Sequence, residues 1–164
     1  MTGTRSARVT VRAATVKDLD TVVALRVALL REHSTNPVYR RVRPDVTTRA
    51  RRVFAQQLDS PGEVTFLAER SGKAVGILRC VESGGSPLLL PAQYAYVSSV
   101  YVLPEARRAG VLTALMGYAE AWAREAGLEE FRLHSVATSV AAISAWDALG
   151  FEIVEHLRTR PVGN

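Results

Sequence analysis

Cysteine is almost missing from this sequence of 164 residues, which contains only Cys80. A single thiol cannot form an internal disulfide. The three histidines stand in no Cys-x-x-Cys or His-Glu-x-x-His spacing, so we expect no metal site. Gly-x-Gly-x-x-Gly and Gly-x-Ser-x-Gly are absent too, which disfavours a Rossmann enzyme and a serine hydrolase. Any catalysis is therefore expected to be metal-free.

Long apolar runs are also missing. No segment approaches the length that crosses a bilayer, and the first residues lack the apolar core of a secretory signal. We therefore expect a cytoplasmic protein without a membrane partner. The net charge of +5 suits an acidic ligand, nucleic acid or simply a solvated surface. No zinc-finger spacing or RNA-binding motif supports nucleic acid, so we expect no such partner.

With 48% hydrophobic residues, the chain is long enough for one domain with a full core, and we predict a single domain over residues 1–164 with a loose tail at 1–7. A Leu88-Leu89-Leu90 loop between two prolines could contact a substrate, a partner or its own core, the last being commonest. Periodicity and turn residues predict strands at 8–12, 64–70, 73–81, 94–102, 130–136 and 151–157, and helices near 16–32, 45–58, 111–126 and 140–149. This order, β-α-α-β-β-β-α-β-α-β, predicts an α/β fold of the α+β type, with one mixed sheet and helices on both faces.

The stretch 94–116 organises this pattern. A strand rich in β-branched and aromatic residues stops at Pro104, and a turn marked by Arg107, Arg108 and Gly110 leads into a helix. The first amides of a helix lack internal partners and lie at the positive end of its dipole, so they can bind phosphates. We therefore expect an anionic cofactor at this turn.

Two motifs in the second half resemble signatures of the GNAT (GCN5-related N-acetyltransferase) superfamily. Its pyrophosphate signature, Arg/Gln-x-x-Gly-x-Gly/Ala, matches residues 107–112, and its Asn-x-x-Ala, aromatic and Gly-Phe signature matches Ser139, Ala142, Trp146 and residues 150–151. The resemblance implies a GNAT acyl-CoA N-acyltransferase-like fold and acetyl transfer from acetyl-CoA to a primary amine of a small molecule or protein. It also implies that acetyl-CoA lies in a splay between the fourth and fifth strands.

By this resemblance, several residues would contact acetyl-CoA. Val100 and Val102 would offer backbone groups to the pantetheine arm, while for Arg108 a solvated surface charge is an equal alternative. The full predicted cofactor-binding set is Val100, Tyr101, Val102, Arg107, Arg108, Ala109, Gly110, Val111, Leu112, Thr113, Ser139, Ala142 and Trp146.

Three positions depart from the family pattern. Leu112 replaces Gly or Ala but keeps its amide, and Ser139 replaces an Asn, where its hydroxyl can also cap a helix. Trp146 replaces the Tyr that usually protonates the departing thiolate, which an indole cannot do. These losses leave open a non-catalytic GNAT-like module that binds acyl-CoA as a sensor or interaction domain.

The general base is the least defined part of the prediction. His134 and Ser99 are our catalytic candidates, although a lone strand histidine is more often structural. Weaker candidates are Glu32, Tyr94 and Tyr96, while His33, Asn36 and Tyr39 could line the acceptor site. Little chain follows Phe151, so either the sheet stops early or a second subunit covers its edge, as in a homodimer.

Overall fold

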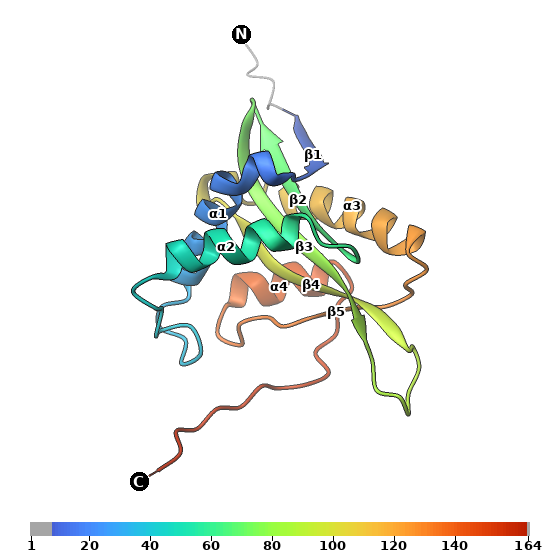
Figure 1. Ribbon diagram of the computed structural model, residues 1–164. Helices are drawn as coiled ribbons and strands as arrows, with labels where there is room; N and C mark the ends of the chain where they lie inside the picture. The colour runs from blue at the N-terminus through green and yellow to red at the C-terminus, as the bar shows by residue number, and fades with distance from the viewer. Residues whose placement is uncertain (1–7, 164) are drawn as a thin grey trace.

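The computed structural model describes residues 8–163, and the predicted loose tail at 1–7 lies outside the described residues (Figure 1). Two short 3-10 turns, Val16–Asp18 and Pro104–Ala106, precede α1 and α3. The elements in chain order are β1 (Val9–Ala13), α1 (Leu19–Glu32), α2 (Val46–Leu58), β2 (Glu63–Arg70), β3 (Lys73–Gly84), β4 (Gln93–Val102), α3 (Val111–Glu125), β5 (Phe131–Leu133) and α4 (Val140–Ala148).

The described strands form one sheet in the order β1-β2-β3-β4-β5. The pairs from β1 to β4 are antiparallel, whereas β4 and β5 are parallel and are joined through α3. Helices α1 and α2 pack on one face, side by side in Figure 1, while α3 packs on the other. The predicted mixed sheet with helices on both faces is confirmed.

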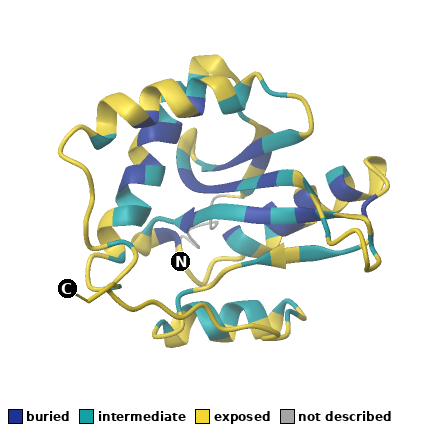
Figure 2. Cartoon of the chain, turned by 60° about the horizontal axis from the view of Figure 1, so that its bottom comes forward, coloured by how far each residue is buried: buried dark blue, intermediate teal, exposed yellow. Residues whose placement is uncertain are grey.

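Alternation along the central strands divides the core into two clusters. Leu67 and Ile77 point toward α1 and α2, while their neighbours Phe66 and Leu78 point toward α3. Because successive side chains of a strand point to opposite faces, two buried faces require strands that are apolar throughout, as β2 and β3 are at their centres. Buried residues accordingly gather along these strands in Figure 2.

Gly76 on β3 sets how closely α3 approaches the sheet. A Cβ at this position would lie 2.8 Å from Cγ1 of Val111 and 3.3 Å from Cδ1 of Leu115. Val111 is the first residue of α3 and is buried. The absence of a side chain at Gly76 therefore positions the N-terminus of α3 against the sheet.

Local signals at the helix starts and the first hairpin are confirmed. Thr15 and Asp18 form a capping box. The Thr15 amide donates to the Asp18 carboxylate, and the Thr15 hydroxyl accepts from the Lys17 amide in the first turn. Strands β2 and β3 are joined through Ser71 and Gly72, both with positive φ, as the predicted tight turn requires.

Three predictions about the C-terminal half and the β3–β4 loop are wrong. Residues 151–157 form no strand, and the segment after α4 is exposed in Figure 2. The Phe151 amide donates to the carbonyl of Trp146, so the chain turns back over the end of α4. The strand predicted at 130–136 is only three residues long, Phe131–Leu133. In the β3–β4 loop, Leu88 and Leu90 are about 90% exposed rather than packed in the core.

Candidate active site

The turn before α3 exposes backbone amides. Gly110 has a φ of 74° and serves as the N-cap of α3, which has no side-chain capping bond. The amide of Ala114 donates to the Gly110 carbonyl, so the amides of residues 111–113 precede the first helical hydrogen bond. Arg108 also has a positive φ, 59°, whereas Ala109 between them does not. Such alternation curls successive amides into a concavity that suits an anion.

The Arg107 side chain turns from this concavity toward the sheet and α1. Its Nε donates to the Val102 carbonyl at 2.9 Å, and its Nη2 donates to Oε2 of Glu32 at 2.8 Å. Its guanidinium carbon lies 5.7 Å from the centre of the Tyr101 ring. The role of Arg107 as a phosphate ligand stays a prediction, while Arg108 is exposed and close to the free amides.

A slot opens between β4 and β5. Pairing joins only residues 95–97 of β4 to Phe131–Leu133, although β4 continues to Val102. Within the described residues, the β5-facing edge of β4 after Val97 therefore has no strand partner. The Leu103 amide donates to the Val75 carbonyl of β3. Because backbone groups alternate in direction along a strand, those of Tyr101 also point toward β3, whereas those of Val100 and Val102 point toward the slot.

A β-bulge lies where the slot begins. Ile77 pairs with Tyr101 but Arg79 pairs with Ser98, so β4 has one more residue than β3 over this interval. Ser99 lies in the bulge with a φ of 53°. A bulge re-aims the backbone of its strand, which here happens at the mouth of the slot.

A cavity of about 180 Å³ occupies this slot and reaches from α1 to α4. On the α1 side it is lined by rings from His33, Tyr39, Tyr96 and His134. Its complete lining is Leu29, Leu30, His33, Tyr39, Tyr96, Val97, Ser98, Ser99, Val100, Leu133, His134, Ser135, Val136, Ala142 and Trp146.

Tyr96 and His134 form a hydrogen-bonded pair in the cavity wall. The Tyr96 hydroxyl lies 2.6 Å from Nδ1 of His134, and the ring centres are 5.7 Å apart. Burial, followed by the neighbouring phenols of Tyr39 and Tyr94, raises the pKa of Tyr96. The phenol therefore keeps its proton at neutral pH and can exchange a hydrogen bond with the imidazole.

The α4 side of the cavity brings together the second group of predicted residues. The Ser139 hydroxyl accepts from the Ala142 amide at 3.3 Å, so the predicted capping role of Ser139 is confirmed. Trp146 lines the cavity and packs edge-on against Phe151, with ring centres 5.2 Å apart. Trp146 therefore forms part of the apolar wall of the cavity, because its large indole ring contributes mainly apolar surface.

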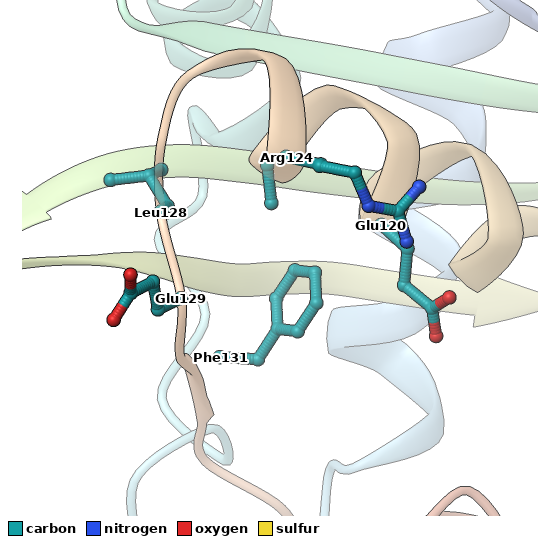
Figure 3. A pocket seen from close by; sticks show the side chains of 6 residues that line it. Glu120, Arg124, Leu128, Glu129 and Phe131 are labelled. Carbon is teal, nitrogen blue, oxygen red and sulfur yellow. The ribbon is translucent and has the colours of Figure 1, made fainter.

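Another hollow, of about 290 Å³, lies between the end of α3 and β5. Figure 3 shows its lining by Glu120, Arg124, Leu128, Glu129 and Phe131. None of the residues that line it is a histidine, tyrosine, serine or cysteine, and neither predicted motif reaches it. The smaller cavity, which contains the Tyr96–His134 pair, is therefore the candidate active site.

The comparison with protein families decides the assignment. The family model described as the acetyltransferase (GNAT) family matches residues 27–151, which is most of the chain. The chain belongs to the GNAT acetyltransferase family. The matched stretch contains α3, the turn before it, the slot and α4.

Individual relatives agree with this family. An aminoglycoside N(6')-acetyltransferase type 1 of Klebsiella aerogenes is 34% identical over 98 residues, which are 60% of this chain and 64% of the relative. The matched stretch thus spans less than two thirds of that relative's length.

Solved GNAT structures share the fold. A protein of Clostridium acetobutylicum solved with acetyl-CoA has a TM-score of 0.75 at 17% identity, covering 94% of this chain and 96% of its own. An aminoglycoside 6'-N-acetyltransferase of Acinetobacter baumannii has a TM-score of 0.74 at 21% identity, covering 96% and 99%.

Sequence reasoning missed part of this GNAT site. The contact between Tyr96 and His134 was not predicted, because it depends on the register of β4 against β5. Leu29 and Leu30 in the last turns of α1, and Ser135 and Val136 after β5, were not singled out as lining the site. Apolar residues in a helix stripe look like core, so only the tertiary structure distinguishes them.

No helix within residues 8–163 is long and apolar enough to cross a membrane. Within the same residues, no three histidine, cysteine or acidic side chains are grouped closely enough to hold a metal ion.

Proposed function

We propose that this chain is an acetyl-CoA-dependent N-acetyltransferase that acetylates a primary amine, on a small molecule or a protein, by direct attack in a ternary complex. The observation that carries the proposal is the slot between β4 and β5, which joins the exposed amides before α3 to a cavity containing a hydrogen-bonded Tyr96–His134 pair. Family membership and relatives that act on amines support it.

The residues of the slot fit an acyl-CoA. The concave turn at residues 108–113 offers unpaired amides for a diphosphate, and Arg108 adds positive charge. The backbone groups of Val100 and Val102 face the slot, as hydrogen bonds to a pantetheine arm require, although the Val102 carbonyl also accepts from Arg107. Ala142 and Trp146 form its apolar wall. The other predicted contacts, from Tyr101, Arg107 and Ser139, stay predictions: Arg107 bonds Val102 and Glu32, the Ser139 hydroxyl accepts from Ala142, and the Tyr101 backbone faces β3.

Acetyl-CoA supplies a thioester whose carbonyl carbon accepts the amine lone pair, after which the C–S bond breaks and the thiolate takes a proton. Backbone amides near the Ser99 bulge, chiefly that of Val100, are our proposed donors to the oxygen that becomes negative during attack. The nitrogen loses one proton for each proton that the sulfur gains, so the overall exchange is balanced.

His134 is our proposed general base. When its Nδ1–H donates to the Tyr96 oxygen, Nε2 is left with a lone pair that can accept the amine proton. In this tautomer the Tyr96 oxygen accepts the bond and holds the orientation of the imidazole. Ser99, which also lines the cavity, is the alternative, acting through a water molecule. The thiolate would take its proton from water, because Trp146 cannot supply one.

The test is release of CoA thiol from acetyl-CoA in the presence of primary amines. We expect turnover by the wild type, a fall in kcat of about 10²-fold in His134→Gln, and a smaller fall in Tyr96→Phe, which keeps the ring but loses the hydrogen bond. The exposed His156 on the C-terminal segment provides a control, since His156→Gln should keep wild-type kcat. Binding of acetyl-CoA without turnover of any amine would instead indicate a non-catalytic module.

We also propose a cytoplasmic location, where acetyl-CoA is available, and a homodimer in which a second copy covers the open edge of β5. Among the described residues that edge has no strand partner, and unpaired strand edges invite pairing with another chain. Light scattering after size exclusion would show a mass of twice 17.9 kDa, and a monomer at micromolar concentration would contradict the dimer.

A further inference from the structure

The acceptor side of the candidate site is aromatic and has no acidic lining. Four rings, from His33, Tyr39, Tyr96 and His134, face the cavity on the α1 side, and none of the lining residues is Asp or Glu. His33 and Tyr39 lie together with ring centres 5.9 Å apart. Flat apolar groups pack well against such rings, whereas a group with several positive charges requires carboxylates to replace its hydration.

Two carboxylates on elements beside the cavity already have arginine partners. Glu32 at the end of α1 is held by Arg107, and Glu63 on β2 is held by Arg79 at 2.5 Å. Other ion pairs join Asp18 and Glu69 to Arg12, Asp20 to Arg51, Asp45 to Arg43 and Arg49, and Glu130 to Arg132. A polycation bound against Glu32 or Glu63 would have to break an ion pair to gain a counter-charge.

The cavity also has excess positive charge close to its wall. Arg26 of α1 stacks on Phe54 with its guanidinium carbon 3.5 Å from the ring centre, and its Nη1 donates to the neutral Gln57 at 2.5 Å. Burial, followed by the charge of Arg79, lowers the pKa of Arg26. Arg79 in turn donates to Ser98, which lines the cavity, and to Glu63, whereas the bond of Arg26 goes to a neutral amide.

The loop that supplies the cavity wall has the same sign of charge. Between His33 and Pro44 the sequence contains Arg40, Arg41 and Arg43 and no acidic residue. A ligand approaching over this loop therefore meets a positive potential, which lowers the local concentration of polycations.

We propose that the acceptor is a small primary amine with a single cationic centre on an aromatic or apolar body, and that this site discriminates against polycationic amino sugars. The inference rests on the proposed acetyl transfer and narrows its acceptor. The dimensions agree, because a cavity of about 180 Å³ is smaller than the ~300–1,000 Å³ of sites for drug-sized ligands.

The experiment compares kcat/KM for 2-phenylethylamine and kanamycin under identical conditions, with release of CoA thiol as the readout. We expect at least a tenfold preference for 2-phenylethylamine. A preference for kanamycin would overturn the acceptor class while leaving acetyl transfer intact. If neither amine releases CoA thiol while acetyl-CoA still raises the melting temperature, the proposed acceptor class is wrong. If no amine in a wider panel releases CoA thiol, the proposed acetyl transfer is wrong as well.

A pair of variants tests the reason for the preference. Ser135 is exposed and lines the cavity, so Ser135→Asp adds a carboxylate, and Ser135→Asn adds the same volume without charge. We expect Ser135→Asp to raise the kanamycin to 2-phenylethylamine ratio of kcat/KM about tenfold over Ser135→Asn. Any disturbance of the adjacent His134 acts on both amines, so the ratio isolates the charge. An equal ratio in the two variants would contradict electrostatic exclusion.

Discussion

At the scale of single residues, Gly110 combines a backbone requirement with the proposed diphosphate contact. Its φ of 74° is left-handed, and a Cβ there would meet no protein atom within 4 Å, so a side chain would project into open space beside the proposed diphosphate site. Gly110→Ala should lower the free energy of unfolding by about 1 kcal/mol and weaken acetyl-CoA binding at least tenfold. Chemical denaturation and titration calorimetry measure the two effects.

Gly127 provides the matched control for this substitution. It has a φ of 72°, an equally open environment and a place just after α3, at the end away from the turn. Gly127→Ala should therefore show the same stability loss with unchanged acetyl-CoA affinity. Equal loss of affinity in both variants would mean that Gly110 acts through stability alone.

Asp18 provides a pH-dependent prediction at the same scale. The hydrogen bond from Arg12 is the main cause that lowers its pKa to about 2 from 3.8. Because the folded state binds the proton less readily than the unfolded chain, the contribution of Asp18 to stability is present above pH 4 and is lost as pH falls toward 2. The effect should be about 1 kcal/mol or less, since Arg12 is half exposed.

Urea denaturation of Asp18→Asn between pH 7 and pH 2 measures this contribution. The variant should be less stable at pH 7 and should converge with the wild type near pH 2. Asp147→Asn, at an exposed position on α4, is the control and should follow the wild-type curve. A constant difference between Asp18→Asn and the wild type at every pH would contradict the ion-pair explanation.

Features that depend only on neighbouring residues could be predicted from the sequence. The sequence was sufficient to predict a glycine-marked turn before α3 and the capping role of Ser139, because both depend on neighbouring residues. The bond of Arg107 to Glu32 joins residues 75 positions apart and has no local signal. The Tyr96–His134 pair was hidden for the same reason.

At the scale of elements, the position of α3 depends on its contact with β3. Gly76→Ala would place a Cβ 2.8 Å from Val111, whose movement would shift the first turn of α3 and the amides before it. We expect a loss of about 1–3 kcal/mol of stability together with weaker acetyl-CoA binding. Gly84→Ala on the same strand has open space around it and should change neither quantity appreciably. Unchanged acetyl-CoA affinity in Gly76→Ala would contradict the proposed dependence of acetyl-CoA binding on the packing of α3 against β3.

Helices were easier to predict than strands for a physical reason. The apolar stripes of α1, α2 and α3 are complete within each segment, so periodicity alone predicts them. A strand also requires a neighbour, and the alternating pattern after Phe151 finds none among the described residues. The shortening of β5 has a related cause, because β4 and β5 diverge after Val97. The same divergence creates the slot.

At the scale of the whole molecule, Cys80 reports on the integrity of the core. It is fully buried in the cluster under α3, and burial raises the pKa of its thiol to about 12. The thiolate is the reactive form, so the native protein should not react with a disulfide reagent such as DTNB at pH 8 over minutes. One thiol per chain should react at once in guanidinium chloride. Rapid labelling in native buffer would contradict a closed core.

We propose that one sheet positions both halves of the site, the turn at the start of α3 and the gap beside β4. A crystal structure of the protein with bound acetyl-CoA tests it most directly. We predict diphosphate oxygens within hydrogen-bond distance of amides in residues 108–113, and the thioester carbonyl beside Val100. A diphosphate bound elsewhere, or a thioester outside the gap between β4 and β5, would contradict the account.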